Sequence, residues 1–334
     1  MIIYDGIIEK LQSGGGVTVV FNELIARSSN YKYISYDEKS KFAINPVLRK
    51  SRLLERYLNV NVDEYSNENT LFHSTYYRLP VQKENPIITT VHDFTYEKFN
   101  KGLSSWVHSW QKNKAINNSD KIICVSENTA QDLLKYCPIN ESKIEIVHNG
   151  VSDDYYVLKS DKRYSNEVVF VGARSGYKNF SAVIDVVALC PNLSLSVVGG
   201  GVFNKAELSL LNNKLPGRFK WLGRLSNQEL NEVYNRSYCL LYPSSYEGFG
   251  IPVIEAMRSG CPVVALNISS IPEVAGSAAL LIEYLDINLL AEAVKSLDNS
   301  SYREKYIQAG LINSQRFSWD RCFMETQKVY RSLS

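Results

Sequence analysis

The sequence predicts an α/β fold in which parallel sheets are covered by helices on both faces. Short apolar segments rich in β-branched residues alternate with longer segments of helical periodicity, which is typical of parallel sheets that are buried on both sides. At 334 residues the chain is too long for one ordinary core and suits two domains of roughly 150 residues each. Because the alternation recurs in both halves, we expect two doubly wound, Rossmann-like domains.

Eight segments are predicted to be strands, three in the first half and five in the second. They span residues 86–93, 121–126, 143–150, 167–172, 193–201, 218–223, 238–244 and 261–266. Helical periodicity marks residues 126–137, where Ser126 is a candidate N-cap, and residues 226–237. A last amphipathic helix is predicted over 317–333, with Ser318 as its N-cap.

The domain boundary is expected in residues 151–167, where periodicity is weakest and polar residues are densest. We therefore expect an N-terminal domain over 1–155, a C-terminal domain over 165–312, and a terminal helix within 313–334. In an open parallel sheet, binding sites lie at the carboxyl ends of the strands. The loops that follow the predicted strands are accordingly where functional residues are sought.

The bulk composition excludes several classes of function. A net charge of +2 provides no global field for nucleic acid, so no nucleic-acid partner is expected. The six cysteines are scattered without a C-x-x-C pair, which predicts reduced and mostly buried thiols. Because no eighteen consecutive residues are apolar and the N-terminus lacks a basic leader, we expect a cytoplasmic protein.

Residues 39–58 form a basic stretch with six Lys and Arg side chains, interleaved with Leu and Tyr, and with Glu55 as its one acidic residue. Such a stretch is either a solvated helix face or a peripheral contact with anionic lipid at the inner face of the membrane. The six residues are Lys39, Lys41, Arg49, Lys50, Arg52 and Arg56.

The segment YEGFGIPVIEAM (246–257) places Glu247 and Glu255 on either side of a glycine loop and an expected helix start at Pro252. Glycines let backbone amides approach a ligand, and a helix N-terminus favours phosphate. Carboxylates repel phosphate but accept hydrogen bonds from sugar hydroxyls. The pattern suits a nucleotide sugar. Alternatively, Glu255 only interacts favourably with the helix dipole from the first turn, and Glu247 is a solvated loop residue.

The segment VGARSGYKNF (171–180) supplies Arg174 and Lys178 in a loop before a helix. Both are suited to phosphate oxygens, although a surface Arg and Lys near a helix start are also common. The chain contains no D-x-D pair, so no metal site is expected and these cations would replace a metal.

In the first half, Gly15 and Gly16 precede an apolar helix, and His92 ends a predicted strand. The glycine segment matches neither the Walker nor the dinucleotide pattern, which removes the main support for an ATPase or a dehydrogenase. The glycine loop would still allow close approach to phosphates. A histidine at a strand end is either structural or a ligand contact.

These segments resemble the retaining glycosyltransferases of family 4, which have the GT-B fold of two Rossmann-like domains facing across a cleft. The likeness is carried by the two glutamates with seven residues between them, by the Arg/Lys loop and by four further stretches: SENTAQDLL, IVHNGV, QSGGGVTVVFNEL and FSWDR. It spans nearly the whole chain and implies that the helix within 313–334 crosses back to the first domain. One departure is Tyr177, where many relatives have Arg, which leaves open which cation serves the leaving group.

The resemblance implies a role for each candidate residue. The donor diphosphate would be bound by Arg174, Lys178, Gly15 and Gly16. The ribose would be bound by Glu255, and the transferred sugar by Glu247 together with backbone groups of Phe249, Gly250 and Ile251. The base would be bordered by Trp221, Leu222 and Arg224. His92 would lie near the transferring carbon, so His92 and Glu247 are the catalytic candidates.

Such enzymes transfer a sugar with retained anomeric configuration, without an organic cofactor or a metal. The 177–180 segment resembles that of O-antigen mannosyltransferases, so the expected donor is a nucleotide-diphosphate sugar with GDP-mannose as the first candidate. The expected acceptor is a lipid-linked or glycan chain of a surface polysaccharide. Two other interpretations stay open: a non-catalytic nucleotide-sugar-binding partner subunit, and a hydrolase that uses Glu247 and Glu255 as acid and base.

Overall fold

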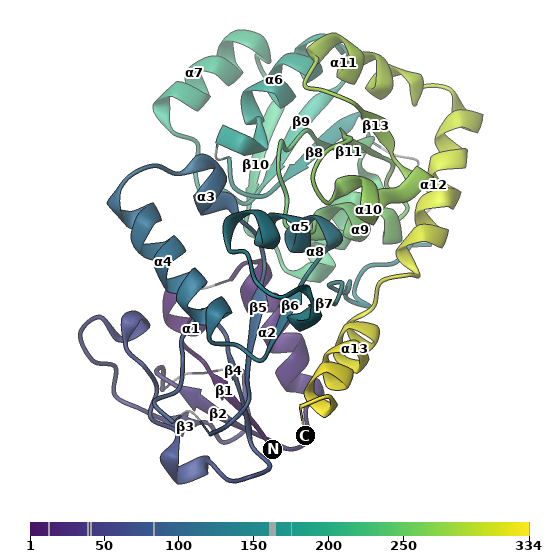
Figure 1. Ribbon diagram of the computed structural model, residues 1–334. Coiled ribbons are helices and arrows are strands. Elements are labelled where there is room, and N and C mark those ends of the chain that lie inside the picture. The colour runs from purple at the N-terminus through teal and green to yellow at the C-terminus, as the bar shows by residue number, and fades with distance from the viewer. Residues whose placement is uncertain are drawn as a thin grey trace. The chain divides into compact units, whose positions relative to one another are not determined.

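The computed structural model describes residues 1–12, 14–38, 40, 42–82, 84–159, 165–174 and 176–333 (Figure 1). The chain divides into two compact units: unit 1 comprises Met1–Gly150 and Ser318–Ser334, and unit 2 comprises Val151–Phe317. Each unit contains one sheet, and in both sheets all paired strands are parallel. The predicted α/β class is therefore confirmed.

Within the described residues, the sheet of unit 1 has seven strands in the order β3-β2-β1-β4-β5-β6-β7. Its strands are β1 (Ile2–Asp5), β2 (Tyr31–Ser35), β3 (Val47–Leu48), β4 (Leu71–Ser74), β5 (Ile87–Val91), β6 (Lys121–Cys124) and β7 (Ile144–Ile146). The three strands predicted in this half are β5, β6 and β7. The four strands before them were not predicted.

Helices connect the strands of unit 1 and cover its sheet. They are α1 (Ile8–Leu11), α2 (Gly16–Arg27), α3 (Thr95–Phe99), α4 (Leu103–Asn117), α5 (Glu127–Tyr136) and α13 (Trp319–Arg331), with short 3-10 turns η1 (Glu55–Tyr57), η2 (Asp63–Tyr65) and η3 (Glu141–Lys143). Ser126 caps α5 by accepting from the Thr129 amide, and Ser318 caps α13 by accepting from the Arg321 amide, both at expected N-cap residues.

The last helix, α13, belongs to unit 1 and packs against α2. Its Tyr330 hydroxyl lies 3.1 Å from the Tyr4 hydroxyl and 2.7 Å from Nδ1 of His73. Nε2 of His73 in turn lies 2.9 Å from the Thr90 hydroxyl. This chain of buried polar groups fixes the helix on β1, β4 and β5, because an unpaired member would cost free energy in the core.

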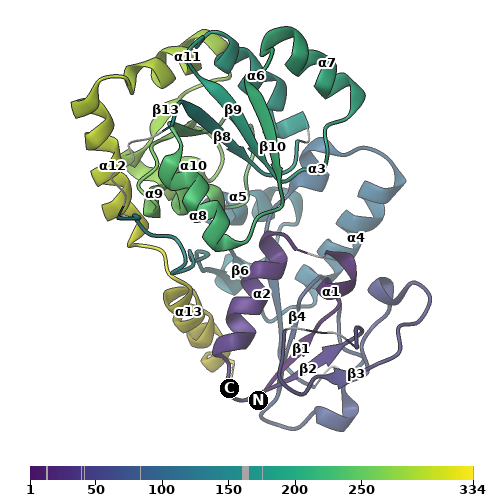
Figure 2. The same cartoon turned by 180° about the vertical axis from the view of Figure 1, so that it is seen from behind.

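Unit 2 contains, within the described residues, a six-stranded sheet in the order β10-β9-β8-β11-β12-β13, seen from behind in Figure 2. Its strands are β8 (Glu167–Val171), β9 (Ser194–Val198), β10 (Phe219–Gly223), β11 (Cys239–Tyr242), β12 (Val263–Leu266) and β13 (Leu280–Ile282). All five strands predicted here are found, and β13 is additional. Four of these strands are buried along most or all of their length, as expected when helices cover both faces.

The helices of unit 2 alternate with its strands. They are α6 (Phe180–Ala188), α7 (Lys205–Lys214), α8 (Asn227–Arg236), α9 (Ile251–Arg258), α10 (Ile271–Ala275), α11 (Ile287–Ser296) and α12 (Ser300–Ser314), with 3-10 turns η4 (Gly176–Lys178) and η5 (Gly276–Ala278). Capping boxes built on Asn204 with Glu207 and on Ser226 with Glu229 begin α7 and α8.

The unit boundary lies between Gly150 and Val151, at the start of the segment where the linker was expected. Residues 160–164 of that segment lie outside the described residues. All six cysteines are buried and free of disulfides, which agrees with the prediction of buried thiols. None of the helices in the described part of the chain has the length and apolar character needed to cross a membrane.

Candidate functional site

The strand order of unit 2 marks one point at the carboxyl edge of its sheet. From β8 the chain runs outward through β9 and β10, and it then returns to the other side of β8 with β11. Open parallel sheets bind their ligands where the direction of winding reverses in this way. The loops that follow β8 and β11 carry Lys178 and Glu247.

Lys178 and Glu247 form a buried ion pair across these two loops. The ammonium of Lys178 donates to Oε1 of Glu247 at 2.5 Å and to the Tyr242 hydroxyl at 3.2 Å, and the residue is 9% exposed. Burial by itself lowers the pKa of Lys178, but the Glu247 carboxylate and the Tyr242 hydroxyl outweigh it, so the pKa is raised. The structure therefore holds a fixed positive charge at the switch point.

The two loops are joined by further hydrogen bonds. Asn179, in the left-handed conformation with φ +53°, donates from Nδ2 to the Pro243 carbonyl and to the Ser245 hydroxyl, both at 2.7 Å. The Ser245 amide donates back to the Tyr177 carbonyl at 2.8 Å. These bonds keep the Lys178 loop in place beside Glu247.

The glycine loop after β11 is held by two serines that precede α10. The Ser269 hydroxyl donates to the Glu247 carbonyl at 2.6 Å and lies 3.1 Å from the Glu247 amide. The Ser270 hydroxyl lies within 3.0 Å of the carbonyls of Glu247 and Phe249. The backbone that presents Glu247 is therefore fixed on both sides of the side chain.

Helix α9 begins at Ile251, so Pro252 is its second residue and not its first. Gly250 is the N-cap with φ +96°, and a Cβ on this residue would lie 2.8 Å from Cδ1 of Ile271. Glycine is therefore required here for conformation and for space. Because Glu255 is the fifth residue of the helix, its expected place in the first turn is wrong.

Glu255 faces α8 and contacts tyrosine. The Tyr234 hydroxyl donates to its Oε2 at 3.0 Å. Burial of the carboxyl raises the pKa of Glu255 to about 7, while the hydroxyls of Tyr234 and Tyr155 oppose this shift. Glu255 is thus a carboxyl that is poised between its two protonation states near neutral pH.

Arg174 lies in the loop after β8 but does not face Lys178. Its Nε and Nη2 donate to the two carboxylate oxygens of Glu207 at 2.7 and 3.1 Å. Its Nη1 donates to the carbonyls of Gly199 and Gly201 at 3.2 and 3.0 Å, and Nη2 donates to the Val202 carbonyl at 2.9 Å. The guanidinium also lies over the ring of Phe203. All five N–H groups of this side chain therefore have partners within the protein.

The residues expected near the base follow β10. Trp221 is 38% exposed, and its Nε1 donates to the Gly199 carbonyl at 3.0 Å, beside Arg174. Leu222 is half-buried and Arg224 is exposed. The remaining sugar-contact candidates differ in burial. Phe249 is buried against Phe317, whereas Ile251 is half-buried at the start of α9.

In unit 1, His92 follows β5, and Gly15 and Gly16 begin α2. Nε2 of His92 is buried without a hydrogen-bond partner among the described residues. Burial lowers the pKa of His92 to about 4, which Asp93 opposes and Lys112 reinforces. The imidazole is therefore neutral at physiological pH, with a ring nitrogen free for a ligand.

The basic stretch is not a helix. Residues 42–58 form the short strand β3 and the turn η1, connected by irregular backbone, and Lys39 and Lys41 lie outside the described residues. Arg78, which is 2% exposed, holds this conformation: its Nη2 donates to Oε1 of Glu55 at 2.6 Å, and its Nε donates to the Leu58 carbonyl at 2.8 Å. The segment therefore follows the sheet edge.

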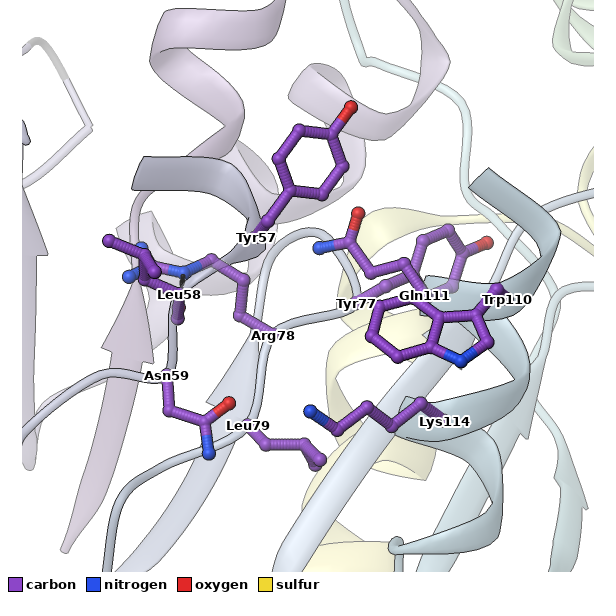
Figure 3. A pocket seen from close by; sticks show the side chains of 9 residues that line it. All are labelled: Tyr57, Leu58, Asn59, Tyr77, Arg78, Leu79, Trp110, Gln111 and Lys114. Atoms are coloured by element: carbon purple, nitrogen blue, oxygen red, sulfur yellow. Dashed lines mark hydrogen bonds between the residues drawn. The ribbon is translucent and has the colours of Figure 1, made fainter. Parts of the chain in front are cut away.

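Between this segment and α4 lies a hollow of about 240 Å³, including the space open to solvent (Figure 3). Tyr57 and Leu58 line one side, and Trp110 and Lys114 of α4 line the other. In the same two segments, Leu53 is 89% exposed and Trp106 of α4 is 66% exposed. Both segments therefore expose large apolar side chains, and α4 adds the cation Lys114.

Sequence reasoning missed the residues that hold the site together. Tyr242, Ser269, Ser270, Tyr234 and Glu207 contact candidate residues but lie in no charged or glycine-rich motif. Only the Asn204–Glu207 capping pattern before α7 was visible as a signal, and it predicts a helix start and not a partner for Arg174. Among the described residues, no three His, Cys, Asp or Glu side chains lie close enough together to hold a metal ion.

Comparison with known families assigns both halves of the chain. Residues 159–311 match the model described as glycosyl transferases group 1, and residues 32–155 match the model described as glycosyltransferase family 4. The chain is 25% identical over 284 residues to the O-antigen chain mannosyltransferase B of Escherichia coli, which covers 79% of this chain and 74% of the relative.

Comparison with solved structures agrees with this result. A sucrose-phosphate synthase from Thermosynechococcus elongatus matches with a TM-score of 0.77 and 18% identity, over 99% of this chain and 98% of its own. The Anabaena protein HepE, solved in complex with UDP and glucose, matches with a TM-score of 0.76 and 16% identity, over 99% of both chains. These likenesses show the GT-B fold.

Proposed function

Because this chain belongs to glycosyltransferase family 4 and is a glycosyltransferase of polysaccharide synthesis, we propose that it transfers mannose from GDP-mannose to a lipid-linked or glycan acceptor, with retention of configuration and without a metal. The proposal of mannose is supported by the name of the Escherichia coli relative. A GT-B fold divides this work, with the acceptor at unit 1 and the donor at unit 2.

The single observation that carries the proposal is the Lys178–Glu247 pair at the switch point of unit 2. A diphosphate that enters here takes the ammonium of Lys178 as its counter-ion. Glu247 is then released to accept hydrogen bonds from hydroxyls of the transferred sugar. Charge that develops on the departing diphosphate is stabilised by a cation that is already in place, which is the most effective form of electrostatic catalysis.

For the remaining candidate residues of each unit, the proposal assigns roles from their chemistry. Glu255 accepts the ribose hydroxyls, and His92 of unit 1 offers a neutral ring nitrogen to the transferred sugar. Gly15, Gly16 and Gly250 allow backbone amides near phosphate. The hydrolase interpretation loses support, because Glu247 contacts Lys178 and Glu255 contacts Tyr234.

A panel of nucleotide sugars in a thermal-shift assay tests the donor. A ligand at one hundred times its dissociation constant adds about 2.7 kcal/mol to the stability of the folded state, so the true donor raises the melting temperature clearly. We expect GDP-mannose to exceed UDP-glucose, and Lys178→Ala to abolish the shift. A larger shift with UDP-glucose would replace mannose and guanine in the proposal, whereas saturable donor binding without transfer to any acceptor would favour the partner-subunit interpretation.

We further propose that unit 1 contacts an anionic membrane surface through residues 42–58 and α4. The exposed Leu53, Leu54 and Trp106 supply apolar and aromatic anchors, and the same segments carry positive charge on Lys114 and on Arg52, which is paired with Glu55. Sedimentation with vesicles that contain or lack phosphatidylglycerol tests this contact. Leu53→Asp with Leu54→Asp should abolish binding, and equal binding to neutral vesicles would remove the electrostatic part of the proposal.

A further inference from the structure

The triglycine loop, residues 199–201 after β9, is held in a conformation that requires glycine. Gly199, Gly200 and Gly201 have φ values of +82°, +67° and +74°, in the left-handed region that L residues with side chains rarely adopt. Three such residues in succession form no regular structure and need bonds from outside to stay ordered. The structure provides them from Arg174 and Trp221.

The bonds of Arg174 run to one side of this loop. Its guanidinium donates hydrogen bonds to the carbonyls of Gly199, Gly201 and Val202. Nε1 of Trp221 also donates to the Gly199 carbonyl. The Gly199 amide is bonded to the Gly223 carbonyl at 2.7 Å. Among the described residues, the amides of Gly200 and Gly201 have no hydrogen-bond partner. With the carbonyls of Gly199 and Gly201 occupied, two N–H donors of the loop are left to a ligand, beside the carbonyl of Gly200.

Arg174 has no donor left for a phosphate. Its five N–H groups are matched by five acceptors, and its charge is neutralised by the bidentate contact with Glu207. Its side chain is only 5% exposed. A phosphate contact would require breaking the Glu207 pair or releasing the loop carbonyls.

We propose that Arg174 is a positioning residue: it shapes the triglycine loop so that the loop amides contact the nucleotide diphosphate of the donor, and it does not touch the phosphates itself. This inference rests on the proposed donor site of unit 2. Under this proposal, Lys178 is the side-chain cation that pairs with the diphosphate.

Gly200→Ala separates this role from direct phosphate contact. A Cβ on Gly200 would lie 2.5 Å from Nη1 of Arg174, so the substitution disturbs the clamp while keeping the charge of Arg174. We expect both Gly200→Ala and Arg174→Ala to weaken donor binding at least tenfold, with the acceptor KM unchanged. Gly217→Ala is the matched control, because Gly217 also has a positive φ of +72° but has nothing within 4 Å of its Cβ.

Two further variants give opposite results under the two roles. Arg174→Lys keeps the charge but cannot bridge four groups, so it fails to rescue a clamp and partly rescues a phosphate contact. Glu207→Gln removes the partner charge; it weakens donor binding if Arg174 is a clamp and tightens it if Arg174 reaches the phosphates. Normal donor affinity in Gly200→Ala, or tighter binding in Glu207→Gln, would overturn the proposal.

Limited proteolysis of the protein without donor tests the conformation of the loop independently of the proposed function. Trypsin cleavage after Lys205, at the end of the loop, should be faster in Arg174→Ala and Gly200→Ala than in the wild type and in Gly217→Ala. If cleavage rates are equal, the clamp is wrong even when donor binds. If the wild type binds no nucleotide sugar while cleavage responds as expected, the proposed function fails and the clamp stands.

Discussion

Glu255 makes donor affinity depend on pH near neutrality. Its folded-state pKa of about 7 is above its ordinary value, so below pH 7 the free protein carries a protonated carboxyl. Ribose hydroxyls donate to the ionised form, so binding must release this proton. We expect the dissociation constant to fall as pH rises from 5.5 to 7, by up to about tenfold per unit, and to level off above pH 7.5. Calorimetric titrations across this range measure it.

Two variants check the origin of this dependence. Glu255→Gln should flatten the profile, because no proton is left to release. Tyr234→Phe removes a hydroxyl that favours the ionised carboxyl, so the midpoint should move to higher pH. A profile that is unchanged in Glu255→Gln would assign the titration to another group.

The buried ion pair makes Lys178 a stability determinant as well as a binding residue. Lys178→Met leaves the Glu247 carboxylate in the interior without its cation, which typically costs roughly 3–5 kcal/mol. Replacing both partners, with Lys178→Met and Glu247→Leu, should restore most of the free energy of unfolding. Urea denaturation measures the two values, and equal losses in the single and double variants would show that the pair is not coupled.

At the level of single residues, the sequence allowed the charged site candidates to be predicted but not the residues that they contact. Lys178 and Glu247 could be selected because phosphate and hydroxyl chemistry demand a cation and a carboxylate beside glycine loops. That they contact each other depends on β8 lying next to β11, which no local pattern encodes. Arg174 was interpreted in the same way as Lys178, because its bonds to Glu207 and the glycine loop join residues 25 to 33 positions apart.

Among the elements, helix α9 depends on Gly250 for the angle at which it begins. Gly250→Ala introduces strain at φ +96° and a contact of 2.8 Å with Ile271. We expect a loss of roughly 1–3 kcal/mol in the free energy of unfolding. Thermal denaturation tests it against Gly176→Ala, a substitution with nothing within 4 Å and no unusual φ. Similar losses in both variants would contradict the special requirement at Gly250.

The strands of unit 2 could be predicted because most of their residues are continuously apolar and flanked by turns. Two of the missed strands of unit 1, β2 and β3, escaped prediction because their sequences are polar or short. β2 (Tyr31–Ser35) includes a lysine and begins with partly exposed residues, and β3 has two residues. Their strand character comes from pairing with a neighbour, β2 with β1 and β3 with β2, so the register is set from outside each segment.

Across the whole molecule, Tyr330 joins the end of the chain to its beginning. Tyr330→Phe removes the hydroxyl shared with Tyr4 and His73 and leaves both buried groups short of a partner. We expect unit 1 to lose about 1–3 kcal/mol of stability. Hydrogen exchange in α2 and α13 should increase while exchange in unit 2 stays unchanged. An equal increase in both units would show that the helix does not stabilise unit 1 selectively.

The membership of α13 in unit 1 has a consequence for biosynthesis. Unit 2 is an insertion within unit 1, so the ribosome completes residues 151–317 before it releases the piece that closes the first core. At ordinary elongation rates this interval lasts about 10 to 30 seconds. During this interval the surface of α2 that α13 covers in the finished unit lacks that helix, while all of the residues of unit 2 become available for folding.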